Sequence, residues 1–307
     1  MQIINSLHER INENTIICIG NFDGIHTVHQ KIIYKTIEQA KQNFCKSMVI
    51  SFKEHPVSVL NLSKKQKLLM PLDEKINIFE EMGVDYLCLY DFKDVRNVYA
   101  ESFIEKLSLN YNMQKIICGF NFKFGYKNRG DINLLNRMSS KYNYEVEKLE
   151  SFKMFHKKVS STKIRTYIKY GEIEKANEFL GRLFYIKGIV VKGKQLGRQL
   201  GFPTANMTYS PFFSTPQNGV YATITEIEGK KYCSMTNIGY NPTFKNKYIS
   251  IETHMLNFNE NLYGKEIKVN FVKKLRNEVL FPDVHSLIDQ LSKDKIDAYE
   301  ITKKYLK

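Results

Sequence analysis

The chain has 307 residues, of which 43% are hydrophobic and 25% charged, and its formal net charge is +14. This length suits about two domains, each with a sizeable core, and the composition is ordinary for a globular protein. No apolar run approaches the roughly 20 residues that span a bilayer, and the first residues lack the order of a signal peptide. We therefore expect a cytoplasmic protein with no membrane contact.

The positive charge indicates anionic partners, either nucleic acid or phosphorylated small molecules. The lysines are spread along the chain, and only residues 63–67 form a dense run. We therefore expect small-molecule substrates and consider nucleic acid unlikely, while a homo-oligomer stays open. The five cysteines never form a Cys-x-x-Cys pair, which indicates structural thiols rather than a disulfide framework or a zinc site.

Strand-like and helical segments alternate in the first half of the chain. The apolar runs expected as strands are residues 15–20, 46–52, 85–90, 115–119 and 144–148. The segments with apolar residues at helical spacing are 30–40, 71–82, 100–107 and 131–142. This alternation predicts a doubly wound parallel α/β sheet, in which ligands bind at the carboxyl ends of the strands.

The second half has a different pattern. A helical pair, 163–170 and 172–180, comes first, with Ser161 or Thr162 as the expected cap of its first helix. Short alternating strands then predict an antiparallel β-barrel, closed by a helix over 283–299. The expected strands are residues 184–192, 219–227, 231–238, 248–257 and 266–274. We therefore predict an N-terminal α/β domain over residues 1–182 and a C-terminal barrel domain over residues 183–307.

The most informative stretch of the first domain follows its first strand. Residues 20–26 read Gly-Asn-Phe-Asp-Gly-Ile-His, and a helix is expected to begin near His29. A strand, a glycine-bearing turn and a helix N-terminus make an anion site, because backbone N–H groups and the helix dipole point at one place. His26 and His29 lie on the same side of the first turn, where both can contact a phosphate chain. The alternative is a tight turn with two exposed histidines.

Two further segments of the first domain suit ligand binding. Residues 119–125 turn between two glycines and present Asn121, which both donates and accepts hydrogen bonds. A purely structural aromatic turn is the alternative. Residues 160–165 place hydroxyl groups at a helix start and Arg165 one turn later, where a guanidinium suits phosphate. Taken alone, a capped surface helix with an exposed arginine is the simpler interpretation of this second segment.

Residues 192–206 are the richest stretch of the second domain. Gly193, Gly197 and Gly201 make a loop that carries Lys194 and Arg198, and this loop can fold over a nucleotide phosphate tail. The Walker pattern of phosphate-binding loops is absent. A simple hairpin loop is the alternative interpretation.

Four side chains beyond this loop complete the candidates. Thr204 and Asn206 face the same side of an extended chain, and their oxygens suit a hard cation such as Mg²⁺ shared with phosphate oxygens. Glu252 lies on an alternating strand and is either a general base towards a substrate hydroxyl or part of a solvated strand face. Arg276 precedes the last helix and either orders a ligand or caps that helix.

Together these segments resemble one family over nearly the whole chain, the bacterial bifunctional riboflavin kinase/FMN adenylyltransferases, also called FAD synthetases. Seven segments in order carry the resemblance: Gly-Asn-Phe-Asp-Gly-x-His (20–26), Gly-Phe-Asn-Phe-Lys-Phe-Gly (119–125), Ser-Ser-Thr-x-Ile-Arg (160–165), Leu-Gly-Arg (180–182), Gly-Arg-x-Leu-Gly-Phe-Pro-Thr-Ala-Asn (197–206), Asn-Ile-Gly-x-x-Pro-Thr-Phe (237–244) and Leu-Tyr-Gly-Lys (262–265).

The resemblance implies two successive reactions. Riboflavin is phosphorylated by ATP in the barrel, and the resulting FMN receives AMP from a second ATP in the first domain, giving FAD. His26 and His29 would neutralise the ATP phosphates during in-line attack. The other residues that the resemblance assigns to ATP and phosphate in this domain are Gly20, Phe22, Asp23, Gly24, Asn121, Ser161, Thr162 and Arg165.

In the kinase domain, the resemblance implies that Glu252 takes the proton from the ribityl hydroxyl. Thr204 and Asn206 would hold Mg-ATP, since Mg²⁺ bridges phosphate oxygens in phosphoryl transfer generally. The residues that it assigns to ATP or flavin are Gly193, Lys194, Gly197, Arg198, Gly201, Pro203, Asn237 and Arg276.

Two positions depart from the family pattern: Glu54, where proline is usual, and Val28, which matters more. The family has His-x-Gly-His, whereas the third place here is Val28, whose β-branched side chain adds bulk and restricts the backbone. Our leading hypothesis is a bifunctional enzyme that makes FMN and FAD. A second is a riboflavin kinase whose N-terminal domain is impaired and only binds nucleotide or regulates. A third is a basic nucleic-acid-binding protein that has kept the scaffold.

Overall fold

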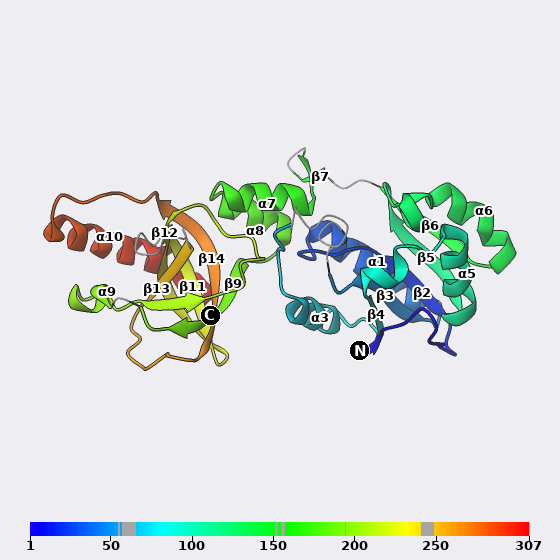
Figure 1. Cartoon of the computed structure of the whole chain (residues 1–307), viewed down its shortest axis with the longest axis horizontal. Helices are drawn as coiled ribbons and strands as arrows, with labels where there is room; N and C mark the ends of the chain where they lie inside the picture. Colours follow the sequence, from blue (N-terminus) through cyan, green and yellow to red (C-terminus); the bar gives the residue numbers. More distant parts are fainter. Residues whose placement is uncertain are drawn as a thin grey trace. The chain divides into compact units, whose positions relative to one another are not determined.

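The structure, a computed structural model, describes residues 1–54, 56, 66–150, 153–154, 157–193, 195–240 and 249–306. Its contacts divide the chain into two compact units, Met1–Ser161 and Thr162–Lys307 (Figure 1). Helix α7 (Ser161–Lys169), apart from its first residue Ser161, and helix α8 (Ile173–Leu180) group with the barrel by this division. The predicted domain boundary after residue 182 stays a prediction.

The first unit is built on a six-stranded parallel sheet with the order β1-β4-β3-β2-β5-β6, which confirms the predicted α/β class. The strands are β1 (Gln2–Ile4), β2 (Thr15–Ile19), β3 (Lys46–Phe52), β4 (Tyr86–Tyr90), β5 (Met113–Gly119) and β6 (Glu145–Leu149). The sequence did not predict β1, because three residues at a sheet edge are too short for an alternation to be visible.

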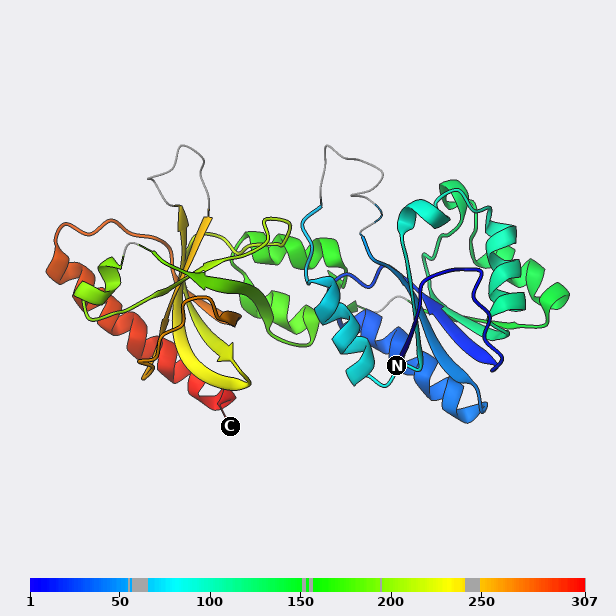
Figure 2. The same cartoon turned by 60° about the horizontal axis from the view of Figure 1, so that its bottom comes forward.

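Helices cover both faces of this sheet (Figure 2). These helices are α1 (Thr27–Gln42), α3 (Leu72–Glu81), α5 (Ala100–Asn110) and α6 (Ile132–Tyr142). The unit also contains a short helix α4 (Phe92–Val95), a 3₁₀ turn (Tyr126–Asn128) and a separate two-stranded ribbon of β7 (Lys153–Met154) and β8 (Lys157–Lys158). Ile16 and Cys18 of β2 join a core with α1 and α3, while Ile17 and Ile19 join a second core with α5 and α6. Successive side chains of a strand point to opposite faces, so β2 is buried on both.

The order of the strands places a topological switch point beside β2. The chain passes from β2 to β3 on one side, whereas β5 lies on its other side. In open parallel sheets, ligands bind in the crevice outside the carboxyl ends of the strands at such a point. The histidine turn follows β2 and the Asn121 turn follows β5, so the sheet brings the two predicted segments to neighbouring strand ends.

The second unit is a closed antiparallel barrel with the order β10-β13-β12-β11-β14-β9, as predicted. Its strands are β9 (Phe184–Val191), β10 (Ala205–Thr208), β11 (Gly219–Ile227), β12 (Lys230–Tyr240), β13 (Ile249–Met255) and β14 (Glu266–Arg276). A short helix α9 (Leu196–Gln199) interrupts the glycine-bearing loop, and a 3₁₀ turn (Lys303–Tyr305) follows the last helix. Residue 248, the expected start of a strand, lies outside the described residues.

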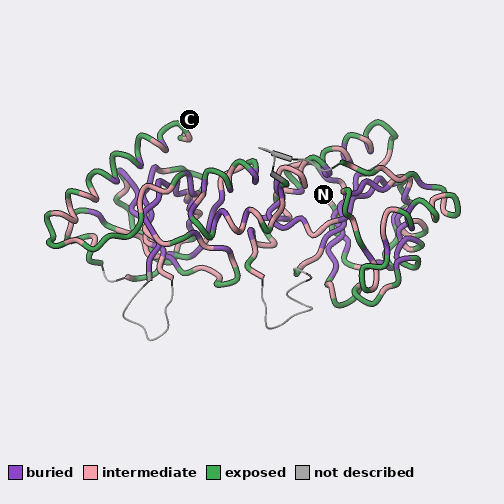
Figure 3. Tube along the Cα trace, turned by 90° about the horizontal axis from the view of Figure 1, so that it is seen from above, coloured by how far each residue is buried: buried purple, intermediate pink, exposed green. Residues whose placement is uncertain are grey.

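The long helix α10 (Val284–Thr302) packs on the outside of the barrel against β11, β12 and β14. Ala222 and Met235 face it from the barrel and join a small core with Ala298. Because alternate residues point the other way, the hydroxyl groups of Thr223 and Thr236 lie inside the barrel and hydrogen bond to each other at 2.8 Å. Buried residues accordingly follow the strands, and exposed ones follow the outer sides of the helices (Figure 3).

One predicted helix cap is wrong, and one of the two interpretations of Arg276 is excluded. Helix α7 begins at Ser161, so it already includes both Ser161 and Thr162. The N-cap of α10 is Asp283, whose carboxylate accepts the N–H of Ser286 at 2.7 Å, so Arg276 does not cap that helix. In both cases the sequence offered several polar residues near the helix start, and pattern alone did not fix which of them lay at the cap.

Candidate active sites

The histidine turn forms as a close pair of rings at the start of α1. His26 is the N-cap of the helix, and its Nδ1 accepts the backbone N–H of His29 at 3.4 Å. The two imidazoles stack with centroids 3.5 Å apart and planes 15° apart. Because Nδ1 of His26 is an acceptor, a neutral ring carries its proton on Nε2, where it is a donor. The turn therefore sets two imidazoles side by side where the helix dipole favours anions.

The backbone between β2 and α1 is strained. Gly24 has φ +80°, which suits glycine, but Phe22 has φ +48° and the β-branched Ile25 has φ +33°. Such conformations cost of order 1–3 kcal/mol each and persist only where the surroundings over-determine them. Both side chains are buried in the core that carries α1. The Phe22 ring also packs edge-on against the His29 ring, with centroids 5.2 Å apart, and so supports the second imidazole.

Hydrogen bonds from surrounding segments hold this turn. The carbonyl of Asn21 accepts from Nζ of Lys75 at 2.8 Å and from Oγ of Ser51 at 3.2 Å. The carbonyl of Asp23 accepts from Oγ of Ser161 at 2.9 Å, and its buried carboxylate accepts the N–H of Leu69 at 3.0 Å. Asp23 and Ser161, predicted ligand residues, thus fix the shape of the turn.

The remaining predicted residues of this site have distinct places. Gly20 lies against the Phe22 ring, since a Cβ atom there would be 3.0 Å from it. Asn121 is exposed in the turn after β5. Thr162 is exposed and Arg165 half-buried on α7, within the second unit.

Lys75 is a residue that the sequence did not single out. It lies in the first turn of α3 with only 6% of its surface exposed. Burial lowers the pKa of its ammonium group to about 8, against the opposing effect of the Asp23 carboxylate. A lysine on an amphipathic helix is normally solvated, so its pattern gave no signal.

In the barrel, three predicted residues are paired in register on adjacent strands and form a polar row. Asn206 of β10 pairs in register with Glu252 of β13, which pairs with Asn237 of β12. Directly opposite residues point to the same face, so the carboxylate lies between two amides. A Cβ atom on Gly193 would lie 2.4 Å from Nδ2 of Asn206, so the glycine loop passes directly over this row.

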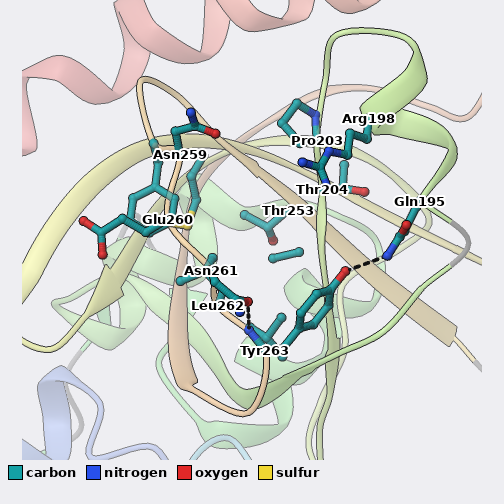
Figure 4. A pocket seen from close by; sticks show the side chains of 14 residues that line it. Gln195, Arg198, Pro203, Thr204, Thr253, Asn259, Glu260, Asn261, Leu262 and Tyr263 are labelled. Carbon is teal, nitrogen blue, oxygen red and sulfur yellow. Dashed lines mark hydrogen bonds between the residues drawn. The ribbon is translucent and has the colours of Figure 1, made fainter.

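A pocket of about 470 Å³ opens beside this row, and three predicted residues line it: Arg198, Pro203 and Thr204. Arg198 and Thr204 lie across it from Asn259 and Glu260 (Figure 4). Other lining residues that the sequence had not assigned to a site are Gln195, Thr253, Asn259, Glu260, Asn261 and Tyr263. The segment 262–265 belonged to the family resemblance, but no role had been attached to it.

A side-chain hydrogen bond and a close backbone approach shape the loops beside the pocket. Nε2 of Gln195 donates to the hydroxyl of Tyr263 at 3.0 Å, which joins the glycine loop to the loop after β13. Gly197 approaches the carbonyl of Phe202 so closely that a Cβ atom would lie 2.4 Å from it. Gly201 has φ +82°, which suits glycine. Lys194 lies outside the described residues.

The pocket and the row occupy opposite faces of β13. Thr253 lines the pocket, and Glu252 is its neighbour in the strand. Successive side chains alternate in direction, so the carboxylate points away from the face that carries Thr253. Thr204 lines the pocket and comes two residues before Asn206, so this short segment connects the two groups of predicted residues.

Arg276 is engaged with the last helix. Its Nε and Nη2 donate to the carboxylate of Asp294 on α10, at 2.8 Å for Nη2, and Asp294 is 2% exposed. Nε2 of Gln290 donates to the same carboxylate at 2.9 Å. This buried ion pair ties the end of β14 to α10, and Nη1 of the same guanidinium donates to the carbonyl of Asn277 at 3.1 Å.

These features define a two-unit protein with a stacked histidine pair at a helix N-terminus in one unit and a polar row beside a pocket in the other. Residues 8–163 match the FAD synthetase family model, and residues 180–302 match the riboflavin kinase family model. The chain therefore belongs to the bifunctional riboflavin kinase/FMN adenylyltransferase family.

Relatives from several bacteria carry that bifunctional name. The protein of Buchnera aphidicola subsp. Schizaphis graminum is 37% identical over 99% of each chain. That of Bacillus subtilis is 36% identical over 95% of this chain and 94% of its own. A solved Streptococcus pneumoniae structure named a macrolide-efflux protein is 27% identical, with a TM-score of 0.89 over 96% of this chain and 98% of that chain. This likeness establishes a shared fold. No helix in the described parts of the chain is long and apolar enough to cross a membrane.

The buried ammonium of Lys75 predicts a pH effect on stability. Its pKa is about 8 in the folded chain and 10.5 ordinarily, so between these values the unfolded chain binds more protons. The stability of the folded chain therefore increases as the pH rises from about 8 towards 10.5, and this gain is lost as the pH falls through 8. We expect the unfolding free energy of the wild type, minus that of Lys75→Met, to increase by about 1 kcal/mol from pH 7 to pH 9. Denaturant titrations followed by circular dichroism measure this, and a difference that is constant with pH would contradict it.

The buried pair of Arg276 and Asp294 predicts an asymmetric mutational effect. Asp294→Ala removes the partner and leaves the guanidinium charge half-buried, so we expect a loss of about 3 kcal/mol in unfolding free energy. Asp289→Ala on the same helix is the control and should change stability by less than about 0.5 kcal/mol. Equal losses in the two variants would show that the pair does not anchor α10.

Proposed function

We propose that this chain makes FMN from riboflavin and ATP in its barrel, and FAD from FMN and ATP in its α/β unit. One observation carries each half. For adenylyl transfer it is the stacked pair of His26 and His29 at the N-terminus of α1. For the kinase it is the carboxylate of Glu252 between the amides of Asn206 and Asn237. Family membership supports both halves.

In adenylyl transfer, a phosphate oxygen of FMN attacks the α-phosphorus of ATP. The bond from that phosphorus to the oxygen shared with the β-phosphate breaks, and pyrophosphate leaves. Imidazole N–H groups donate to the phosphate oxygens and stabilise the charge that the leaving group gains. We assign this role to His26 and His29, with Asn121 and Ser161 as further contacts. Gly20, Phe22, Asp23 and Gly24 give the turn its shape. No covalent intermediate is required, so the site works by positioning and electrostatics.

In the kinase, the terminal ribityl hydroxyl attacks the γ-phosphorus of ATP. The bond to the oxygen shared with the β-phosphate breaks, ADP leaves, and the carboxylate of Glu252 takes the hydroxyl proton. We assign the pocket lined by Arg198, Pro203 and Thr204 to the nucleotide. Gly193, Gly197 and Gly201 belong to the loop beside it, and Arg276 ties the end of β14 to α10.

We also propose that the kinase uses Mg²⁺. Thr204 and Asn206 offer a hydroxyl and an amide oxygen, which are hard ligands of the kind that Mg²⁺ prefers. Among the described residues no cluster of three His, Cys, Asp or Glu side chains is present, so a metal here would take most of its ligands from phosphate and water. Bound there, the ion neutralises phosphate charge.

Small-molecule anions explain the charge of the chain better than nucleic acid does. Many lysines pair with carboxylates, as Lys53 does with Asp91 and Lys115 with Glu145. Dependence on ATP supports a cytoplasmic location.

Two variants should separate the activities. His26→Ala removes one imidazole and should lower FAD formation from FMN by about 100-fold or more, while FMN formation from riboflavin continues. Glu252→Gln keeps the shape of the row but removes the base, so it should lower FMN formation by a similar factor while FAD formation from added FMN continues. Chromatography of the flavins after incubation with ATP and Mg²⁺ measures both. A variant that loses both activities while folded would contradict two separate sites.

Val28 provides a further prediction. Its side chain is partly buried and packs against the core that carries α1. We therefore expect Val28→Gly to destabilise the chain by about 1–2 kcal/mol, through lost packing and glycine in a helix, without raising FAD formation. Val28→Ala is the intermediate variant and should lose less stability. A several-fold gain in FAD formation with Val28→Gly would show instead that the valine obstructs ATP.

A further inference from the structure

Lys75 joins the ends of two neighbouring strands at the proposed adenylyl-transfer site. Its Nζ donates to the carbonyl of Asn21 at 2.8 Å and to the carbonyl of Phe52 at 3.2 Å. Asn21 begins the histidine turn after β2, and Phe52 is the last residue of β3. The two strands are parallel neighbours, so one ammonium group holds both chain ends at the carboxyl edge of the sheet.

Lys75 carries its charge at a buried place, where the Asp23 carboxylate offsets part of the cost of burial. Burying an ammonium group is unfavourable, and burial accordingly lowers the pKa of Lys75. The carbonyl of Asn21 already accepts from Ser51, so a neutral partner is available to it. A buried charge next to a strained turn indicates that Lys75 fixes the geometry of the turn in addition to contributing to stability.

The turn needs such support, because its backbone is held in strained angles. Phe22 and Ile25 hold positive φ angles on either side of Asp23, and the ring of His29 rests on the ring of Phe22. A turn that relaxes towards ordinary backbone angles would move Phe22 and would separate the two imidazoles. The carbonyl of Asn21 is the last backbone group before Phe22, so a bond at this carbonyl fixes where the strained segment begins.

We propose that Lys75 is a positioning residue for adenylyl transfer, which holds the carbonyl groups of Asn21 and Phe52 and thereby keeps His26 and His29 in place. This inference rests on the adenylyl transfer proposed above. Lys75 acts through the turn and does not touch the reacting atoms. Its loss should therefore reduce the rate of the chemical step more than the binding of ATP.

The test uses the full chain and the variant Lys75→Met, which keeps the length of the side chain but has no donor. We expect kcat for FAD formation from FMN to fall about 100-fold while KM for ATP changes less than about threefold. Riboflavin phosphorylation in the same sample should be unchanged, and it serves as the internal control. Lys75→Arg restores a charged donor and should recover at least about tenfold of the lost kcat.

A matched control is Lys115→Met. Lys115 is also a poorly exposed lysine of the parallel sheet, but its Nζ pairs with Glu145 and with Gln39 rather than with the turn. We expect this variant to keep FAD formation within about threefold of the wild type. Equal losses in Lys75→Met and Lys115→Met would mean that any buried lysine of the unit has the same effect, and would overturn the positioning role.

Ser51→Ala covers the case in which Lys75→Met does not fold. It removes the second donor to the carbonyl of Asn21 with little change in volume, so kcat should fall several-fold at constant KM. An unchanged kcat in Ser51→Ala would then overturn the inference, as would a folded Lys75→Met with wild-type kcat. A wild-type chain that forms no FAD from FMN would overturn the proposed function together with this inference. A wild-type chain that forms FAD alongside an equally active Lys75→Met would overturn this inference alone.

Discussion

The first unit depends on a turn that the backbone does not adopt by preference. Between β2 and α1 the chain takes positive φ angles at Phe22 and Ile25, and it buries both side chains. Donors from α3, β3 and the start of α7 bind the carbonyl groups of Asn21 and Asp23 and hold this conformation. The strained conformation of the turn places the two imidazoles in contact at a helix N-terminus. Electrostatic catalysis needs donors that are already oriented, because reorientation during the reaction would consume their effect.

The barrel uses a different device, the alternation of side chains along one strand. Thr253 of β13 lines the pocket, whereas Glu252 lies on the opposite face between Asn206 and Asn237. The buried hydroxyl groups inside the barrel, from Thr223 through Thr236 to Thr253, form a chain of hydrogen bonds that fixes the pocket side of this strand.

Pattern and motif predicted the two architectures and both groups of polar residues. The long apolar strands and the amphipathic helices were visible because burial on two faces or on one face imposes a period on the sequence. Strands β1 and β10 were missed, since three and four residues leave no period to detect.

Lys75 and Asp294 were missed for another reason. Each is a charged residue on a helix, which the sequence alone assigns to solvent, and only the tertiary contacts reveal that it is buried. Phe22 and Asp23 were predicted as ligand contacts, whereas their packing shows how they support the turn. That distinction needs coordinates.

The most direct test of two reactions on one chain follows the phosphorus atoms. Riboflavin and the purified protein are incubated separately with ATP labelled at the γ-phosphorus and with ATP labelled at the α-phosphorus, and FMN and FAD are isolated from each. The two-site mechanism predicts label from the γ-position in both FMN and FAD, and label from the α-position in FAD alone. FAD without the α-label, or FMN without the γ-label, would contradict the mechanism at the corresponding site.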